Sequence, residues 1–174
     1  MKDSLLFKKA GVESVEIYRE LGSRTFLESF GEVNSESDMQ EYLSKSFDNS
    51  VLKKQLNNSD IDVYFVYHED RLVGYLKLNF NKEQNEPYED TWMELERIYL
   101  LSDVQGKGFG QKMLEFAEKI ALDQGKTTVW LGVWEHNNGA RCLYERMGFE
   151  AYAKHDFLLG KDLQVDILMK KSLC

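Results

Sequence analysis

Apolar residues in the first third of the chain recur at the spacing of helices. A short run from Leu5 to Lys9 is a strand candidate, and the region from Val12 to Phe30 carries one apolar helix face. Ser35 can cap a second helix from Glu36 to Phe47, and a third, short helix fits Asp48 to Asn58. The apolar face of the first helix consists of Val15, Tyr18, Leu21, Gly22, Thr25, Phe26 and Phe30.

From Ile61 onward the pattern changes to that of β-strands. Two runs rich in β-branched and aromatic residues, at 61–67 and 72–80, flank a short polar turn and predict a hairpin. After a polar loop that contains Pro87, we expect strands at 93–101, 127–134, 149–157 and 163–169, an amphipathic helix that ends near Gly125, and a helix at 137–147. This order predicts an α/β fold with a mixed sheet, in which hairpins precede a helical crossover.

The chain has 174 residues, and we expect residues 1–174 to form a single domain with one core. Its composition, 43% apolar and 30% charged, is ordinary for a globular protein. No apolar run approaches the roughly 20 residues that span a bilayer, and the one at the N-terminus is too short for a signal peptide. Cys142 and Cys174 form no disulfide framework, so we expect a cytoplasmic protein without membrane attachment.

The net charge of the chain is −8 at pH 7. Nucleic-acid binders normally present a basic face, so we expect no nucleic-acid partner. An acidic chain is compatible with a small cationic substrate, although many proteins are acidic for solubility alone. His68, His136 and His155 show no metal-ligand spacing, and we expect no metal.

A glycine-rich stretch, Gln105-Gly106-Lys107-Gly108-Phe109-Gly110, joins the strand at 93–101 to the amphipathic helix. Alternate glycines let the backbone turn sharply, and the free N–H groups at a helix start attract phosphate. A nucleotide P-loop is excluded because Gly108 follows Lys107, and a dinucleotide fingerprint because Gln111 replaces its third glycine. The stretch therefore indicates a phosphate-bearing ligand, with a plain glycine turn at the start of a helix as the alternative.

Two motifs carry a resemblance to a known family. Gln105-x-x-Gly108-x-Gly110 resembles the signature of the GCN5-related N-acetyltransferases (GNAT), and the run from Asn137 through Ala140 and Tyr144 to Phe149 is similar to their second signature. The order of elements also matches over essentially the whole chain. The resemblance implies the GNAT form of an α+β fold: a central mixed, mostly antiparallel sheet of six to seven strands, splayed between strands 4 and 5 and flanked by four to five helices.

A narrower resemblance concerns two strands. Leu95-Glu96-Arg97-Ile98-Tyr99 and Trp130-Leu131-Gly132-Val133-Trp134-Glu135 look like the bacterial PaiA-type spermidine/spermine N-acetyltransferases. It implies direct transfer of acetyl from acetyl-CoA to a primary amine of a polyamine in a ternary complex. The alternatives are a peptide N-terminus or another small amine as acceptor, and a non-catalytic acetyl-CoA-binding regulator. Many relatives dimerise, so a homodimer is a further expectation.

In the GNAT family, acetyl-CoA lies where the central strand and the next strand splay apart. The resemblance implies that the backbone of Ile98, Tyr99 and Leu100 pairs with the pantetheine arm, and that the N–H groups from Gln105 through Gly110 hold the pyrophosphate. Gly132 interrupts its strand, as expected at a close backbone approach or beside a bulky neighbour. Three side chains have two possible roles each. Asn137 hydrogen-bonds the pantetheine arm or serves as the N-cap of its own helix. Lys107 and Arg146 contact a phosphate or lie exposed to solvent.

Acetyl transfer needs a base for an amine with a pKa of roughly 10, an N–H donor for the developing oxyanion, and a proton for the departing thiolate. The resemblance makes Tyr144 the acid, with packing beside CoA as the alternative, and the backbone N–H of Ile98 or Tyr99 the donor. Glu96 is the candidate base, directly or through water, because a carboxylate on a central strand is costly unless it is used or paired. An ion pair with a distant cation is its alternative. Strand alternation places Glu94 on the face of Glu96 and Arg97 on the other.

Two runs of carboxylates contain no lysine or arginine. In the GNAT fold the first run borders the acceptor site, so we expect Glu28 and Glu32, together with Glu96, to bind a polycation; a solvated acidic face is the alternative. His155 could touch the acceptor or be structural. The first run is Glu28, Glu32, Glu36, Asp38 and Glu41, and the second is Glu83, Glu86, Glu89, Asp90, Glu94 and Glu96.

Overall fold

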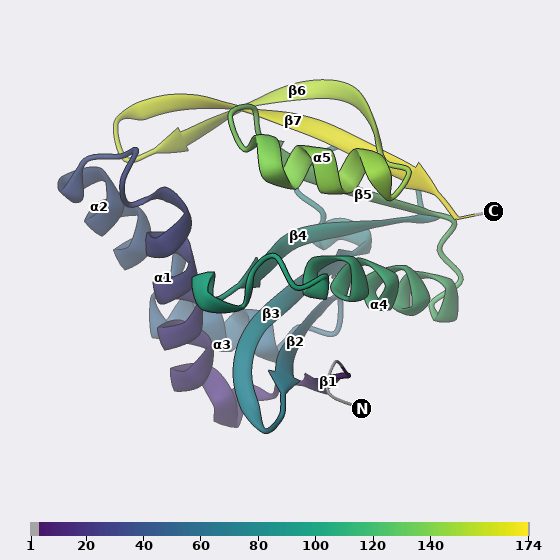
Figure 1. The fold of residues 1–174 in the computed structure, drawn as a ribbon, viewed down its shortest axis with the longest axis horizontal. Helices are drawn as coiled ribbons and strands as arrows, with labels where there is room; N and C mark the ends of the chain where they lie inside the picture. Colours follow the sequence, from purple (N-terminus) through teal and green to yellow (C-terminus); the bar gives the residue numbers. More distant parts are fainter. Residues whose placement is uncertain (1–3, 174) are drawn as a thin grey trace.

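A seven-stranded sheet in the order β1-β2-β3-β4-β5-β7-β6 forms the centre of the molecule (Figure 1). The computed structural model describes residues 4–173, so Cys174, which entered the cysteine argument, lies outside it. The strands are β1 (Leu5–Lys9), β2 (Ile61–His68), β3 (Arg71–Phe80), β4 (Trp92–Leu100), β5 (Thr128–Trp134), β6 (Glu150–Leu159) and β7 (Asp162–Ser172). The helices are α1 (Val15–Phe30), α2 (Glu36–Ser46), α3 (Asn49–Asn57), α4 (Phe109–Asp123) and α5 (Asn138–Arg146). Their order matches the one that the hydrophobic pattern predicts.

Neighbouring strands are antiparallel except β4 and β5, which run parallel. Helix α4 makes the crossover between these two strands, as a parallel pair requires. The hairpin between β2 and β3 turns at Glu69 and Asp70, whose φ angles of 48° and 65° lie in the left-handed region used by tight hairpin turns. Seven strands and five α-helices between residues 4 and 173 confirm the predicted GNAT fold with its mixed, mostly antiparallel sheet.

Side-chain caps begin helices α2 and α3. The Ser35 hydroxyl accepts a hydrogen bond from the N–H of Asp38 at 3.1 Å, and Asp48 accepts one from the N–H of Ser50 at 3.0 Å. These bonds satisfy N–H groups that a helix start leaves unpaired, which determines where each helix begins. The first predicted helix differs at its start, because residues 12–14 form a 3-10 turn and α1 begins at Val15.

Helices cover both faces of the sheet. Tyr18 of α1 packs edge-to-face on Tyr75 of β3, with ring centroids 5.6 Å apart. Phe116 of α4 packs in the same way on Tyr64 of β2 at 4.9 Å. Tyr64 is paired with Leu76, the chain neighbour of Tyr75, so the two contacts lie on opposite faces. The sheet therefore separates α1 from α4.

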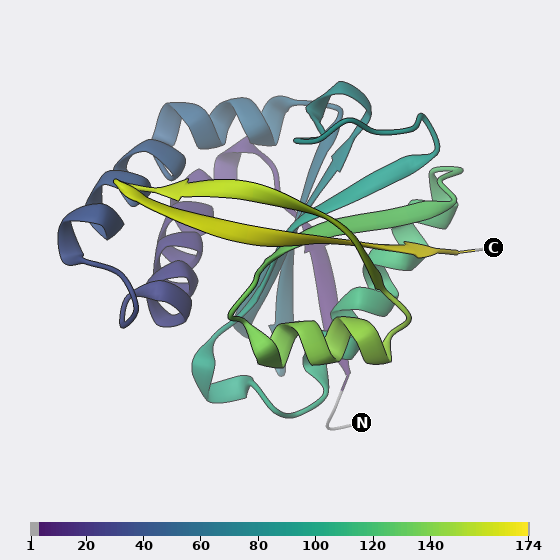
Figure 2. The same ribbon diagram turned by 90° about the horizontal axis from the view of Figure 1, so that it is seen from above.

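The β6–β7 hairpin crosses the molecule and reaches α2 (Figures 1 and 2). Asp38 of α2 accepts a hydrogen bond from the N–H of Lys161 at 3.0 Å, and Gln164 donates one to Asn34 at 2.6 Å. A small apolar cluster near these contacts, separate from the main core, consists of Phe26, Met39 and Leu159. The hairpin is thus fastened to the α1–α2 region by two polar contacts and this cluster.

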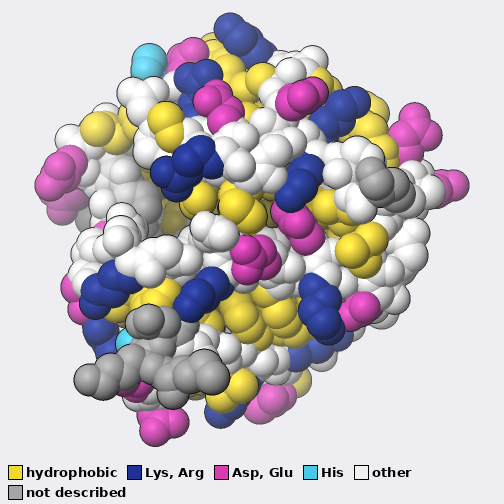
Figure 3. All heavy atoms as spheres, turned by 45° about the vertical axis from the view of Figure 1, so that its right-hand side comes forward, with side chains coloured by type: hydrophobic (Ala, Val, Ile, Leu, Met, Phe, Trp, Pro, Cys, Tyr) yellow, Lys and Arg dark blue, Asp and Glu magenta, His cyan; other side chains and the backbone are white. Residues whose placement is uncertain are grey.

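Charged side chains of both signs share the surface. On the face shown in Figure 3, lysine and arginine side chains lie among acidic and apolar ones. Within residues 4–173, no helix is both long and apolar enough to cross a membrane.

Candidate active site

The pairing of β4 with β5 stops partway along both strands. The parallel ladder begins at Trp92 and Thr128 and ends at Glu94 and Trp130, although β4 continues to Leu100. Beyond the ladder, β4 stays paired with β3, and β5 with β7. Within the described chain, the remaining edge of β4 therefore faces no strand.

A β-bulge in β4 lies beside this separation. The register with β3 passes from Leu95 to Arg97 and leaves Glu96 as the extra residue. The bulge shifts the alternation of side chains, so Arg97 lines the same cavity as Glu94 and Glu96. The prediction that Arg97 lies on the other face is therefore wrong, because it assumed strict alternation along the strand.

A cavity of about 270 Å³ opens where the two strands separate. Its lining comes from α1, α2, the loop before β4, strands β4 and β5, and the β6–β7 hairpin. The apolar and aromatic lining residues are Phe26, Phe30, Tyr42, Tyr99, Trp130, Trp134, Phe157 and Leu168. The polar ones are Asn85, Glu86, Glu94, Glu96, Arg97, His155, Gln164 and Asp166. Carboxylates among aromatic rings suit a ligand that carries cationic groups on an apolar stem.

Glu94 and Glu96 share their hydrogen-bond donors. Asn79 donates to Glu94 at 2.9 Å and to Glu96 at 3.2 Å, and the side-chain amide of Asn85 donates to both carboxylates at 3.0 Å. Lys77, which is only 5% exposed, forms an ion pair with Glu96. The ion pair that remained open as an alternative for Glu96 is thus present, and its partner comes from the adjacent strand.

These surroundings shift the pKa values of the two carboxylates in opposite directions. Burial raises the pKa of Glu94, and the neighbouring charge of Glu96 raises it further. Burial also acts to raise the pKa of Glu96, but Lys77 and Arg97 outweigh it and lower the pKa to about 2. At neutral pH, Glu96 is therefore fixed in its ionised form, whereas Glu94 is the better proton acceptor of the pair.

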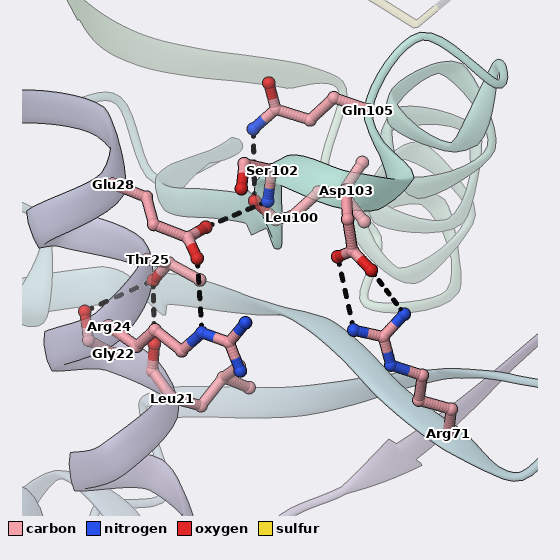
Figure 4. Close-up of polar contacts among 10 residues, drawn as sticks. All are labelled: Leu21, Gly22, Arg24, Thr25, Glu28, Arg71, Leu100, Ser102, Asp103 and Gln105. Carbon is pink, nitrogen blue, oxygen red and sulfur yellow. Dashed lines mark hydrogen bonds and ion pairs between the residues drawn. The ribbon is translucent and has the colours of Figure 1, made fainter.

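Glu28 and Glu32 lie outside the lining of the cavity. Glu28 accepts hydrogen bonds from Arg24 at 3.1 Å and from the N–H of Ser102 at 2.8 Å, and it points toward the turn after β4 (Figure 4). Glu32 is exposed in the turn between α1 and α2. Glu28 therefore faces the turn after β4 and Glu32 faces solvent, and neither lines the cavity in which we expected them to bind the acceptor.

The carboxylates that do line the cavity are Glu86, Glu94, Glu96 and Asp166. Three of them, Glu86, Glu94 and Glu96, belong to the second acidic run, so this run rather than the first contributes to the cavity. Asp166 was missed because it enters through the pairing of β7 with β5, where it lies opposite Trp134. His155 lines the cavity as well and pairs with Glu86.

The glycine loop leads directly into α4. Gly106 and Gly108 have φ angles of 78° and 80°, and a Cβ at either position would meet nothing within 4 Å. Backbone conformation rather than space therefore requires glycine there. The Gln105 side chain donates to the Leu100 carbonyl at 3.1 Å (Figure 4). Phe109 is 2% exposed, so its ring belongs to the core and only its backbone can serve a ligand.

Helix α5 carries the two candidates of the second motif. The Asn137 side chain caps this helix by accepting a hydrogen bond from the N–H of Ala140 at 3.3 Å, which was its alternative role. Tyr144 is 7% exposed, and its hydroxyl makes no hydrogen bond within residues 4–173. Burial raises the pKa of Tyr144, so the phenol keeps its proton at neutral pH.

Ile98, Tyr99 and Leu100 lie in the part of β4 beyond the ladder with β5.

Gly132 lines the cavity, and a Cβ there would make ordinary contacts of 3.4 Å with Asp166 and 3.5 Å with a leucine of β7. A bulky core neighbour therefore does not explain this glycine. Lys107 is exposed on the glycine loop, and Arg146 is exposed at the end of α5.

Comparisons with known proteins agree with this architecture. The family model described as the acetyltransferase (GNAT) family matches residues 18–149. An uncharacterized N-acetyltransferase from the pepI 3′ region of Lactobacillus delbrueckii subsp. lactis is 38% identical over 153 residues, which cover 88% of each chain. A spermine/spermidine N(1)-acetyltransferase of Bacillus subtilis (strain 168) is 31% identical over 93 residues, covering 53% of this chain and 61% of the relative.

A solved structure shows the same fold. The crystal structure of a PaiA N-acetyltransferase from Thermoplasma acidophilum in complex with coenzyme A superposes with a TM-score of 0.77. It is 21% identical in sequence, and the match covers 97% of this chain and 99% of that one. Together with the family match over residues 18–149, the splayed sheet and the glycine loop lead to one conclusion: the chain belongs to the GNAT family of N-acetyltransferases.

Proposed function

We propose that this N-acetyltransferase transfers acetyl from acetyl-CoA to a primary amine of a polyamine such as spermidine or spermine. The amine attacks the thioester directly, with both substrates bound, in a single N-acetyltransferase domain. The observation that carries the proposal is the cavity at the β4–β5 separation, which is lined by four carboxylates and several aromatic rings. The partial relationship to a spermine/spermidine N(1)-acetyltransferase supports the same class of acceptor.

The placement of the carboxylates fits a ligand with separated charges. Glu94 and Glu96 lie where the ladder between β4 and β5 ends, whereas Glu86 and Asp166 come from the loop before β4 and from β7. One pair of carboxylates can thus hold the reacting ammonium group while the other attracts a second one. Aromatic faces pack against the methylene stem and add cation–π attraction.

The two inner glutamates have different roles in this proposal. Glu96, held ionised by Lys77, attracts the ammonium group and no longer serves as the base, because a carboxylate with a pKa of about 2 is a weak proton acceptor. Glu94 takes the proton of the amine, directly or through water, since its pKa is raised. The neutral amine then attacks the thioester carbonyl to form the C–N bond, and the C–S bond breaks as Tyr144 gives a proton to the departing thiolate. The remaining surplus proton on the nitrogen passes to the phenolate of Tyr144, directly or through water.

Replacing Glu94 with Gln should lower kcat about 10- to 100-fold and remove the acidic limb of the pH–rate profile. The limb arises because Glu94 becomes protonated, and so loses its function as base, when the pH falls below its raised pKa. Steady-state kinetics between pH 5 and 9 would check this assignment. An acidic limb that persists unchanged in Glu94→Gln would exclude Glu94 as the base.

The remaining residues serve acetyl-CoA. We assign the pantetheine arm to the free edge of β4 at Ile98, Tyr99 and Leu100, and the pyrophosphate to the N–H groups of residues 105–110. The left-handed glycines and the unpaired start of α4 support this assignment, since free N–H donors and the helix dipole favour an anion. Asn137 keeps its capping role, and its amide N–H₂ group is directed to the arm in this proposal.

Replacing Gly108 with Ala should weaken acetyl-CoA binding about tenfold, because the loop relaxes from a φ of 80° that an L-residue rarely adopts. Gly125→Ala is a matched control at the other end of α4, with a φ of 73° and an equally open surrounding. We expect both variants to lose similar stability, about 1 kcal/mol. Titration calorimetry with acetyl-CoA would show weaker binding for Gly108→Ala alone; equal affinities would contradict the loop assignment.

A panel of amines tests the proposed acceptor. Purified protein with acetyl-CoA is offered spermidine, spermine, diamines, peptides with a free N-terminus and simple monoamines, and free CoA is measured with a thiol reagent. We expect the highest kcat/KM for a polyamine. Turnover of a peptide or monoamine alone would favour the alternative acceptors, and acetyl-CoA binding without turnover of any amine would indicate a regulator.

A further inference from the structure

Arg97 is a charged residue in the cavity that neither the polyamine nor acetyl-CoA explains. The bulge at Glu96 turns its side chain into the cavity, beside the two glutamates. One guanidinium nitrogen donates a hydrogen bond to the Tyr18 hydroxyl at 3.0 Å, and the group lies over the ring of Phe47, 4.7 Å from its centroid. Tyr18 is itself fixed by donating to Gln55 at 2.8 Å. The guanidinium is therefore held in place by neutral groups.

The hydrogen-bonding capacity of Arg97 is largely unused. A guanidinium has five N–H donors, and the bond to Tyr18 is the one that it makes within residues 4–173. The same part of the chain offers it no carboxylate within ion-pair distance; the nearby carboxylate of Glu96 is engaged by Lys77. The charge of Glu96 favours the guanidinium from nearby but accepts no hydrogen bond from it, so the remaining N–H donors of this partly buried cation are left for an incoming acceptor oxygen.

We propose that Arg97 is a binding site for a carboxylate on the acceptor, and that a diamine carrying such a group is preferred to the same diamine without it. This inference rests on the proposed function in placing the acceptor in this cavity, and it adds diamino acids and related compounds to the class of acceptors. The fork of an arginine binds a carboxylate through two parallel hydrogen bonds, which adds both affinity and orientation.

The charges in the cavity fit the three groups of such a molecule. Arg97 follows Glu96 directly in the chain, so the site for a carboxylate and the site for the reacting ammonium group are adjacent. Glu86 and Asp166 remain for the second ammonium group. A plain polyamine would fill the two acidic sites and leave the remaining N–H donors of Arg97 without an acceptor.

Ornithine and putrescine test this inference, because they differ only by the carboxylate. Lysine and cadaverine form a second such pair. We expect kcat/KM for ornithine to exceed that for putrescine by about tenfold or more, and titration calorimetry of the CoA-bound protein to show the same preference. Arg97→Met should abolish the ratio of ornithine to putrescine, Arg97→Lys should reduce it, and Arg19→Met, an exposed arginine of α1, should preserve it.

The outcomes separate this inference from the proposed function. A ratio of one or less in the unmodified protein, or a ratio that Arg97→Met leaves unchanged, overturns the role of Arg97 whether or not polyamines are acetylated. Efficient turnover of ornithine without turnover of spermidine or spermine supports Arg97 and refutes the polyamine acceptor. If Arg97→Met fails to fold, the role of Arg97 is tested by the ratio of kcat/KM for ornithine to that for putrescine, measured in the unmodified protein and in Arg97→Lys. If no amine is turned over, titration calorimetry compares the affinities for ornithine and putrescine and so tests the role of Arg97, because binding can be measured without acetyl transfer.

Discussion

Replacing Tyr144 with Phe should lower kcat at least about 100-fold while the affinity for acetyl-CoA stays within about twofold. The substitution removes one hydroxyl group, which makes no hydrogen bond within the described residues, and leaves the ring in its packing beside Phe149. Because burial raises the pKa of Tyr144, the phenol is protonated at neutral pH and has a proton to give to the thiolate. The loss should therefore fall on turnover rather than on binding or folding.

Tyr67→Phe is the control for this substitution. Tyr67 lies on β2, away from the cavity, and we expect its variant to keep kcat. Rates of CoA release, acetyl-CoA affinity by calorimetry and the unfolding midpoint of both variants complete the comparison. Full turnover in Tyr144→Phe would reduce Tyr144 to a packing residue and leave the proton of the thiolate to water.

Breaking the ion pair between Lys77 and Glu96 should lower the free energy of unfolding by about 3 kcal/mol. The side chain of Lys77 is 6% exposed and that of Glu96 is 24% exposed, so either partner alone is left as a charge with little access to water. We expect this loss in Lys77→Met and in Glu96→Gln, measured by denaturant unfolding at pH 7. The double variant should recover part of it, because both charges are then absent.

The ion pair between Lys77 and Glu96 also makes the free energy of unfolding depend on pH. The pKa of Glu96 in the folded protein, about 2, lies below its ordinary value, so the folded state binds this proton less tightly than the unfolded state. The contribution of the ion pair to the free energy of unfolding is therefore complete above about pH 5 and is lost as the pH falls toward 2. The difference in unfolding free energy between the unmodified protein and the double variant should shrink over that range. A difference that stays constant would contradict the lowered pKa.

The fold and the glycine loop at the start of α4 could be predicted because their signals are local. Helical and strand periodicities are set by neighbouring residues, and the order of elements followed from them. Gly106 and Gly108 require left-handed backbone, which marks a loop in the sequence itself. The predicted cap at Ser35 is likewise short-range, and the structure contains it.

The acceptor side could not be predicted in the same way, because distant segments and one irregularity create it. Strand alternation put Arg97 on the wrong face, since a bulge is invisible to a pattern of period two. Asp166 reaches the cavity through the pairing of β7 with β5. Glu28 lies in an acidic run and has a local partner one helical turn away, Arg24, but its contact with Ser102 is decided by tertiary packing.

The early end of the ladder between β4 and β5 has a consequence for how two substrates meet. A fully paired sheet is a continuous barrier, and α1 and α4 lie on opposite sides of this one. Only beyond Glu94 and Trp130 is the barrier open. For the proposed reaction, a donor anchored at the start of α4 and an acceptor held near α1 approach from different sides and do not compete for one volume. In that arrangement, the opening in the sheet confines their encounter to the few residues of β4 that follow the ladder.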